Sequence, residues 1–395
     1  PIRSKVDGEW LVAEGTTLGA DNGIGLAAAL AVADDKSVIH GPLELLFTVD
    51  EETGLTGAGK LDGGMLEGKR MLNLDSEELG AVFIGCCGGG DSTTTLPLEW
   101  TDAPRGAEGA SVKVRGLRGG HSGLDIHEQR GNAVKILARV LFETGRDLSL
   151  AVETLSGGNK RNAIAREAQA DVLIESGRMD DFASRVSELQ SVIAAELGGK
   201  EPEMSLVVEA TSEPSSRVLT DDSGSKLIGL LLSLPHGVQA MSYDIPGLVE
   251  TSTNMATVSI SGDEAMIVST TRSSIGSALQ SVRDQIRSVG ELAGATVAEN
   301  KPYPGWKPDL DSEVLAAFKR VHVEVTGNEP EVKAIHAGLE CGIIGEKCNG
   351  MDMISFGPDI ENPHSPDERI NIPSVNRFWR LLTAVLEELA VPSTA

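Results

Sequence analysis

Three consecutive acidic residues, Asp50, Glu51 and Glu52, directly follow the apolar run LELLFTV at positions 43–49. The run predicts a buried strand, so the carboxylates stand where an apolar strand ends. Acidic runs are usually solvated turns. The alternative is a metal site, because carboxylates bind divalent ions and one of them can also act as a general base.

Three further residues could converge on this turn, because each stands at the end of another expected element. Asp21 precedes an Ala/Leu-rich helical run and could be only its cap, although glycines on both sides permit close backbone approach. Asp75 follows the apolar run 71–74, and His364 lies in a proline-rich loop, where a single histidine is more often a surface residue. Together the groups could hold two metal ions, with Asp21 as bridge, Glu51 and Glu52 as base and ligand, and Asp75 and His364 as ligands.

The elements that would position these residues alternate between helix and strand. A helix is expected within 15–35, a strand at 43–49, a short helical segment at 55–61 and a strand before Asp75. This alternation predicts an α/β fold with a parallel or mixed sheet covered on both faces. In such sheets the carboxyl ends of the strands form the ligand crevice.

The middle of the chain has a different sequence pattern, with three glycines at 88–90 followed by runs in which polar and apolar residues alternate. The pattern predicts an antiparallel sheet with helices on one face. Helices are expected near 131–144, 179–197, 222–234 and 274–290, and strands near 163–175, 203–209 and 255–271.

Three prolines within 301–308 mark a boundary, after which a helix near 311–326, a strand at 351–356 and a helix near 374–390 restore the α/β pattern. We therefore expect a catalytic domain made of 1–89 and 304–395 and an inserted domain at 90–303.

Composition narrows the class of protein. A chain of 395 residues exceeds the usual size of a single core, and its net charge of −25 argues against nucleic acid or an anionic membrane as a partner. No run approaches the roughly 18 apolar residues of a membrane span, and no signal-peptide pattern opens the chain. We expect a soluble, cytoplasmic protein whose four cysteines are reduced.

Six motifs along the chain carry a family resemblance: GTTLGADNGIG, TVDEETGL, NLDSEE, GGHSGLDI, HAGLECG and SFGPDIENPHSPDERI. In this order they resemble the co-catalytic zinc peptidases related to carboxypeptidase G and the aminoacylases. Within that family the chain looks most like the aminoacyl-histidine (Xaa-His or β-alanyl-histidine) dipeptidases. The resemblance implies a mixed-sheet catalytic domain, phosphorylase/hydrolase-like, with an inserted α+β domain that serves as lid and dimerisation domain.

The resemblance also implies roles in the catalytic domain. Asp21 would bridge two zinc ions, and Glu51 would be the general base that activates water. Glu52 and His364 would complete one metal site, and Asp75 would serve the other. Manganese or cobalt could replace zinc in such a carboxylate-rich site.

In the inserted domain, the resemblance implies that His121 of GGHSG reaches the active site of a partner subunit and stabilises the oxyanion, which requires a homodimer. From the residues alone His121 reads as a turn residue near a strand end. Asn162 of RNAIARE and Arg272 of STTRSS would hold the small peptide substrate, with Arg272 suited to its terminal carboxylate. Gly338 of HAGLECG would line the same pocket.

One expected feature is missing, because family members carry a His-x-Asp pair upstream of the bridging aspartate and the first histidine here is His40. We interpret this as amino-terminal truncation before Pro1, which leaves the Asp75 site without its histidine. Two other functions stay open. One is a tripeptidase, aminoacylase or related amide hydrolase of the same family, and the other is a non-catalytic remnant that binds one metal.

Overall fold

The structure is a computed structural model that describes residues 2–52, 54–211 and 215–390. It divides into two compact units. The first comprises Pro1–Cys87, Tyr243–Pro246 and Pro304–Ala395, and the second comprises Gly88–Ser242 and Gly247–Tyr303. The first unit is thus assembled from both ends of the chain, with a short contribution from 243–246.

The first unit contains two small sheets within its described residues. One is a mixed sheet in the order β18 (Glu331–Ile335), β4 (Ala81–Cys86), β19 (Asp352–Ser355) and β3 (Arg70–Asn73). Its outer pairs are parallel, whereas β19 meets β4 antiparallel. The other has the order β1 (Ser4–Asp7), β2 (Trp10–Ala13), β21 (Arg369–Asn371) and β20 (Ile360–Glu361).

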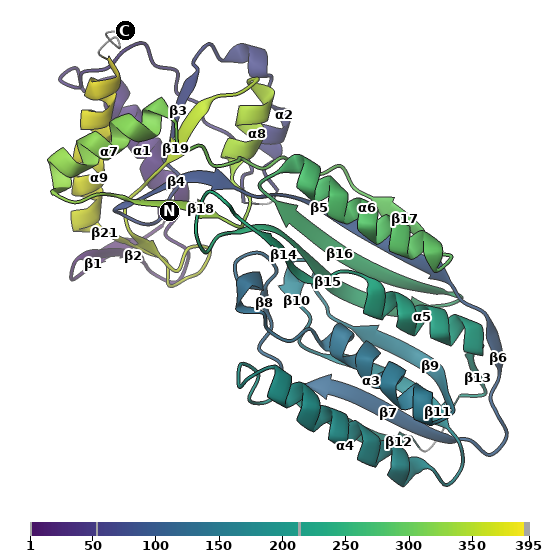
Figure 1. The fold of residues 1–395 in the computed structure, drawn as a ribbon. Coiled ribbons are helices and arrows are strands. Elements are labelled where there is room, and N and C mark those ends of the chain that lie inside the picture. Colours follow the sequence, from purple (N-terminus) through teal and green to yellow (C-terminus); the bar gives the residue numbers. More distant parts are fainter. Residues whose placement is uncertain (1, 53, 212–214, 391–395) are drawn as a thin grey trace. The chain divides into compact units, whose positions relative to one another are not determined.

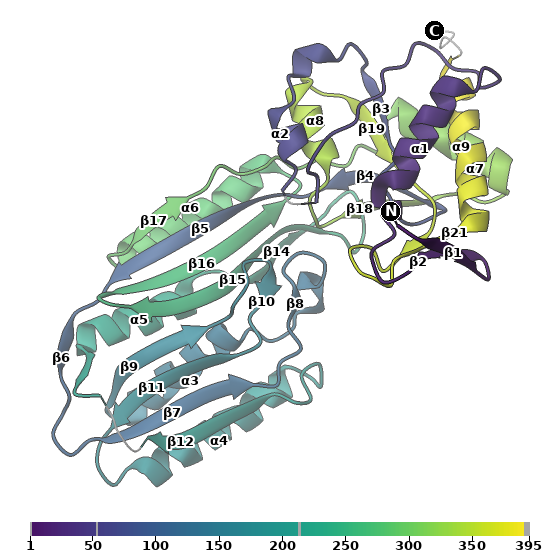
Figure 2. The ribbon, with the colours of Figure 1, turned by 180° about the vertical axis from the view of Figure 1, so that it is seen from behind.

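Helices pack around the mixed sheet. They are α1 (Ala20–Asp34), α2 (Thr56–Lys60), α7 (Glu313–Thr326), α8 (Glu340–Lys347) and α9 (Ile372–Ala390). Figure 1 shows α7 in front of this unit and Figure 2, from behind, shows α1 in front. Buried side chains of β4, β19, α1, α7 and α9 form one core, which includes Val32, Val82, Ile354, Phe318 and Phe378. The mixed α/β fold predicted from the sequence, with its helices near 311–326 and 374–390, is confirmed.

The predicted buried strand at 43–49 is wrong. This fully described segment forms neither helix nor strand, and its apolar side chains are substantially exposed: Leu43 41%, Leu45 40%, Phe47 46% and Val49 71%. A strand needs a neighbour to accept and donate its backbone hydrogen bonds, and no described strand runs beside this segment. The apolar pattern alone therefore does not make it a strand.

The second unit is built on one large sheet, nine-stranded within the described residues. Its order is β12 (Ser205–Thr211), β7 (Glu108–Arg115), β11 (Ala168–Ile174), β9 (Leu150–Gly157), β15 (Val249–Ser261), β16 (Glu264–Ser273), β5 (Gly88–Pro97) and β17 (Thr296–Glu299), with β14 (Gly237–Met241) also paired to β15. The single strand expected at 255–271 is instead the β15–β16 hairpin, which turns at Gly262 with φ +59°.

Two short strand pairs lie outside this sheet: β8 (Gly120–His121) with β10 (Ala163–Ile164), and β6 (Trp100–Asp102) with β13 (Arg217–Leu219). The strand expected at 163–175 is thus divided between β10 and β11.

Four helices cover one face of the large sheet: α3 (Ala133–Asp147), α4 (Met179–Glu196), α5 (Asp221–Ser233) and α6 (Gly276–Leu292). They lie in front of the strands in Figure 1 and behind them in Figure 2. Between helices and sheet lies the larger apolar core, with members such as Val112, Leu137, Val172, Phe182 and Ile267. The sequence prediction of an antiparallel sheet with helices on one face is confirmed.

One lysine ties two of these helices together. Lys135 of α3 donates from Nζ to the carbonyls of Leu231 (2.9 Å), Leu232 (2.7 Å) and Leu234 (2.8 Å) at the carboxyl end of α5. These carbonyls lack partners within their own helix. We expect Lys135→Met to lower the free energy of unfolding by about 1–3 kcal/mol. Urea unfolding should measure this loss, whereas Lys226→Met on the exposed side of α5 should change stability by less than about 0.5 kcal/mol.

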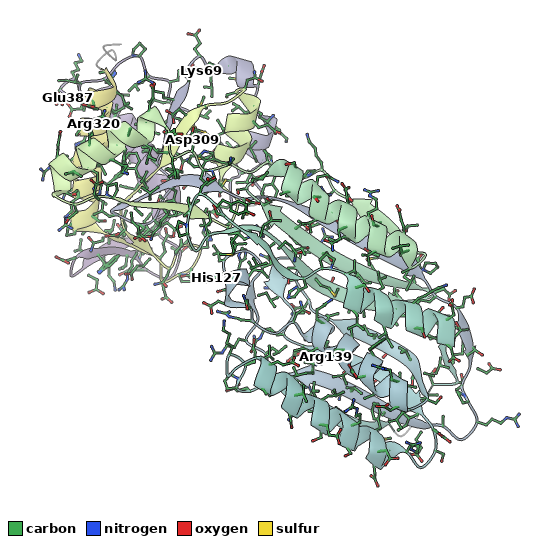
Figure 3. All side chains as sticks on the ribbon, viewed as in Figure 1. Lys69, His127, Arg139, Asp309, Arg320 and Glu387 are labelled. Carbon is green, nitrogen blue, oxygen red and sulfur yellow. The ribbon has the colours of Figure 1, made fainter. Side chains whose placement is uncertain are left out.

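Charged side chains project from the ribbons of both units, as Figure 3 shows for Lys69, Arg139, Arg320 and Glu387. All four cysteines are free and buried. In the part of the chain that the structure describes, no helix combines the length and the hydropathy that a membrane crossing requires.

Candidate metal centre

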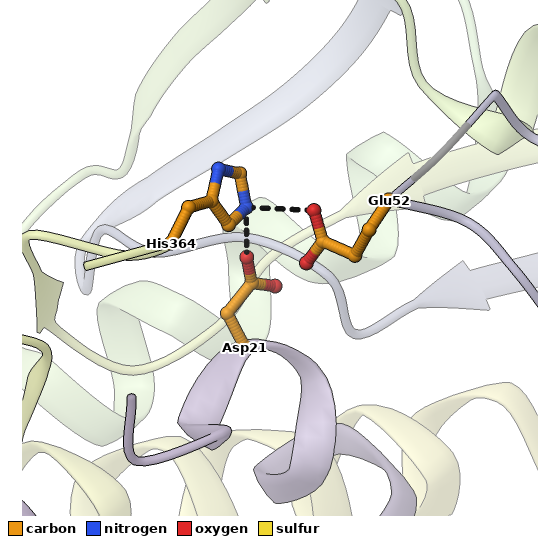
Figure 4. A group of neighbouring side chains, drawn as sticks. All are labelled: Asp21, Glu52 and His364. Carbon is orange, nitrogen blue, oxygen red and sulfur yellow. Dashed lines mark hydrogen bonds and ion pairs between the residues drawn. The ribbon is translucent and has the colours of Figure 1, made fainter. Parts of the chain in front are cut away.

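Three side chains from distant parts of the first unit meet at one point. The Nε2 atom of His364 lies 3.0 Å from Oδ2 of Asp21 and 2.9 Å from Oε2 of Glu52 (Figure 4). One ligand atom from each residue lies within 4.8 Å of the other two. The side chains come from the start of α1, from the acidic turn and from the proline-rich loop, so the fold brings together three residues that the sequence singled out.

Asp21 does not serve as the helix cap. The backbone dihedral angles of Asp21 and Asn22 are not helical, and the peptide bond between them is cis. Instead Oδ1 of Asn22 accepts a hydrogen bond from the backbone N–H of Gly25 at 2.9 Å. Asn22 therefore satisfies the amino end of α1, and the carboxylate of Asp21 is left to face His364 and Glu52.

Glu368 holds the backbone around Asp21, and the sequence reasoning did not identify it. Its carboxylate accepts hydrogen bonds from the N–H groups of Gly19 at 2.8 Å and Asp21 at 3.1 Å, and it is 2% exposed. Together with Thr17 and the three meeting side chains, these residues line a cavity of about 410 Å³. Its position four residues after His364, in the same motif, is the sequence signal that could have identified Glu368.

The loop that carries His364 has an unusual backbone. Both Asn362 and His364 have positive φ, at +54° and +60°. Burial lowers the pKa of His364, but the carboxylates of Glu52 and Asp21 raise it by more, so its pKa lies above the usual histidine value. The carboxylates of Glu52 and Asp21 thus place negative charge next to Nε2 of this imidazole.

Two more predicted residues adjoin this group. Asp75 makes a side-chain hydrogen bond with Asp21, and burial together with the negative charges of Asp21 and Glu51 holds its pKa well above the usual range. Burial, with the charges of Glu52, Glu340 and Asp21, raises the pKa of Glu51 to about 7. Asp21 thus contacts His364 and also makes a side-chain hydrogen bond with Asp75.

The donor set fits a divalent metal ion. Two carboxylates and an imidazole with converging atoms are ligands that zinc accepts, and Asp75 adds a third carboxylate beside them. Close carboxylates raise one another's pKa because like charges repel, and a bound cation relieves that repulsion. The convergence of one ligand atom from each of Asp21, Glu52 and His364 is the observation on which this fit depends.

Gly338 and Glu340 come from the motif HAGLECG. Gly338 lies in the loop between β18 and α8 and is half-buried. Glu340, which the sequence reasoning passed over, is 8% exposed and accepts a hydrogen bond from the hydroxyl of Thr48 at 2.7 Å. Its charge contributes to the raised pKa of Glu51 and Asp75, so this carboxylate belongs to the same acidic cluster.

Within the second unit, the hydrogen bonds of His121 fix its tautomer. Nδ1 lies 3.2 Å from the backbone N–H of Gly123 and 3.0 Å from that of Leu124, and it accepts from both. Burial and the nearby guanidinium of Arg272 lower the pKa of His121. A neutral imidazole whose Nδ1 accepts must carry its proton on Nε2, so His121 presents an N–H donor.

Arg272 and Asn162 lie in the same unit as His121. Arg272 is 8% exposed, donates from Nη1 to the Tyr303 hydroxyl at 3.1 Å, and has no partner for Nε among the described residues. Asn162 is exposed, and its carbonyl accepts from the N–H of Ser122 at 2.8 Å, next to His121. The structure therefore groups the predicted residues into a carboxylate–histidine cluster in the first unit and a His121–Arg272 group in the second.

Comparisons by family model, by sequence and by structure all match this chain to known peptidases. The model of "Peptidase family M20/M25/M40" matches residues 1–388. The cytosol non-specific dipeptidase of Escherichia coli (strain K12) is 41% identical over 389 residues, which cover 98% of this chain and 80% of that protein. The crystal structure of aminoacylhistidine dipeptidase from Vibrio alginolyticus matches with a TM-score of 0.94 and 42% identity, over 100% of this chain and 80% of that one.

A more distant structure, aminopeptidase PepT from Bacillus cereus, has 18% identity and a TM-score of 0.51 over 99% of this chain and 77% of that one, and shares the fold. The family expected from the six motifs is confirmed. The chain belongs to the peptidase family M20/M25/M40.

Proposed function

We propose that this protein is a zinc-dependent dipeptidase that hydrolyses small peptides of the Xaa-His type. The observation that carries the proposal is the meeting of Asp21, Glu52 and His364, with Asp75 and Glu51 beside them, in a chain of this peptidase family. The names of the relatives support a dipeptide substrate, because one is a non-specific dipeptidase and the other an aminoacylhistidine dipeptidase.

The metal ligands in this proposal are Asp21, Glu52, His364 and Asp75, with Asp21 shared between two ions. Bound ions would supply Lewis-acid activation of water and of the peptide carbonyl. Glu51 takes the proton from water and returns it to the leaving amine, which requires a carboxyl that exchanges protons near neutral pH. A pKa of about 7 suits that task.

In the second unit, the Nε2–H of His121 donates to the developing oxyanion, and Arg272 binds the terminal carboxylate of the substrate. Asn162 and Gly338 complete the substrate pocket. We assign His121 to the active site of a partner subunit, which makes the working enzyme a homodimer. The fixed tautomer of His121 and the unpaired Nε of the buried Arg272 support these roles.

Zinc is the proposed metal because it binds both imidazole nitrogen and carboxylate oxygen, and manganese or cobalt could replace it in a carboxylate-rich site. The cytosolic name of the Escherichia coli relative supports a cytoplasmic location.

Metal removal followed by a substrate panel tests the function. We expect a chelator to abolish hydrolysis of Ala-His and β-Ala-His, and one or two equivalents of zinc per chain to restore it. The panel should also contain a tripeptide and an N-acetyl amino acid, each cleaved at least tenfold more slowly. Faster cleavage of the tripeptide or of the acyl compound would reassign the enzyme within its family, and chelator-resistant hydrolysis would contradict the metal site.

A further inference from the structure

His121 sits on a very small piece of sheet. The ribbon formed by β8 and β10 pairs only Gly120 with Ile164 and His121 with Ala163. An isolated two-stranded ladder is marginal in water even when it is longer than this. Something else must therefore hold the ribbon in place. Figures 1 and 2 both draw it beside β14 and β15.

Three polar side chains stand in a row across the neighbouring strands. Asn254 of β15 lies directly opposite Thr270 of β16, and Thr270 lies directly opposite Asp91 of β5. Asn254 is fully buried and Thr270 is 9% exposed. Asparagine is a poor strand former, and burying an amide is costly unless it is hydrogen-bonded. We call Asn254, Thr270 and Asp91 the polar row.

The polar row binds the segment that leads into β10. Nδ2 of Asn254 donates to the carbonyl of Ala163 at 2.8 Å. The hydroxyl of Thr270 lies 3.1 Å from the carbonyl of Arg161 and 2.8 Å from Oδ1 of Asp91. Asp91 also pairs with the guanidinium of Arg161 at 3.1 Å. Every member of the row therefore contacts residues 161–163.

The carbonyl hydrogen bonds of this segment explain how the contact reaches His121. The carbonyls of Arg161 and Ala163 are within hydrogen-bond distance of the polar row. The carbonyl of Asn162, between them, accepts from the N–H of Ser122. The segment 161–163 thus lies between the polar row on one side and the strand that carries His121 on the other.

Arg272 belongs to the same surface. It is two residues beyond Thr270 on β16, so the two side chains project from the same face of the sheet. Its charge reaches His121, whose pKa it lowers. The polar row and Arg272 are therefore carried by three neighbouring strands of the large sheet, β15, β16 and β5, while His121 and Asn162 belong to the ribbon that the row binds and to the segment leading into it.

We propose that Asn254, Thr270 and Asp91 are positioning residues that hold the β8–β10 ribbon, and with it His121 and Asn162, at a fixed place relative to Arg272. The catalytic part of this inference rests on the proposed function, because it takes His121 as the oxyanion donor and Arg272 as the carboxylate binder. The anchoring itself does not depend on any activity.

The test compares matched substitutions on two paired strands, β15 and β16. Thr270→Val removes the hydroxyl from the row and keeps the shape. Thr271→Val makes the same change at the next residue, which is also buried but whose hydroxyl lies 3.1 Å from Thr253 Oγ1. Asn254→Asp replaces the amide NH₂ group by a carboxyl oxygen at the same size, and Thr270→Ser restores the hydroxyl as a rescue.

Amide hydrogen exchange over 119–124 and 160–164 is the readout that needs no activity. We expect at least tenfold faster exchange there in Thr270→Val and Asn254→Asp, and no change in Thr271→Val or Thr270→Ser. With Ala-His as substrate, kcat should fall about 10- to 100-fold in the first two variants, with KM changed less than threefold, because a displacement of about 1 Å can cost about 100-fold in rate.

Each outcome is decisive. Unchanged exchange in both Thr270→Val and Asn254→Asp would overturn the anchoring. Faster exchange with unchanged kcat would overturn the positioning role in catalysis. If the native protein cleaves no dipeptide while exchange still increases, the proposed function fails and the anchoring is upheld.

Discussion

Replacing Glu51 by glutamine is expected to lower kcat for Ala-His hydrolysis by about 10²–10⁴-fold, the usual contribution of a general base. Glutamine has the size of glutamate but cannot take a proton from water. Glu51 is suited to that transfer because burial and the charges of Glu52, Glu340 and Asp21 raise its pKa to about 7. Steady-state kinetics on the intact protein measure the loss.

The zinc content of the variants distinguishes a general base at position 51 from a metal ligand. Glu51→Gln should keep the zinc content of the native protein, whereas Glu52→Gln should lose metal, because Glu52 is the residue whose carboxylate meets His364 at 2.9 Å. If Glu51→Gln keeps more than a tenth of the native kcat, Glu51 is not the base. If it loses zinc instead, Glu51 is a ligand and the roles of the two neighbours are reversed.

Replacing Asp21 by asparagine is expected to weaken zinc binding by on the order of 100-fold or more, since even residues that only orient metal ligands contribute about 10- to 100-fold. Asp21 contacts His364 and also forms a side-chain hydrogen bond with Asp75, so its carboxylate adjoins both predicted ligands. Equilibrium dialysis against zinc, followed by elemental analysis, gives affinity and stoichiometry.

Asp50→Asn is the matched control for this substitution. Asp50 belongs to the acidic turn, but its carboxylate accepts a hydrogen bond from the hydroxyl of Thr56 at 2.5 Å and is not among the atoms that meet at His364. The Asp50→Asn variant should therefore bind zinc with the same affinity as the native protein. Equal zinc affinity in Asp21→Asn and the native protein would remove Asp21 from the site, and equal losses in both variants would indicate a general charge effect.

Periodicity predicted the helices well, because their amphipathic faces are a local property of the chain. The helix expected near 179–197 is α4, Met179–Glu196, and the one near 222–234 is α5, Asp221–Ser233. The prediction of a strand at 43–49 was wrong for the opposite reason. A strand depends on hydrogen bonds to another strand, so an alternating apolar sequence cannot by itself establish one.

The candidate ligands could be named from their motifs, but not the residues that hold them. Glu368 and the polar row bind backbone groups, and nothing in a carboxylate or an amide side chain indicates which distant N–H or carbonyl it will meet. Whether Asp21 is only a helix cap or a metal ligand was likewise open in the sequence. The structure assigns the cap to Asn22, because its side chain reaches Gly25.

By itself the sequence determined the family and the α/β class, and it named the residues of a candidate metal site, since motif order and side-chain chemistry can be read from the sequence. Only the tertiary structure decided that Asp21, Glu52 and His364, up to 343 positions apart, meet at one nitrogen atom. The tertiary structure also decided that the pKa of Glu51 is about 7 and that His121 carries its N–H donor at Nε2. Those properties depend on burial and on neighbours contributed by other elements, which sequence order does not specify.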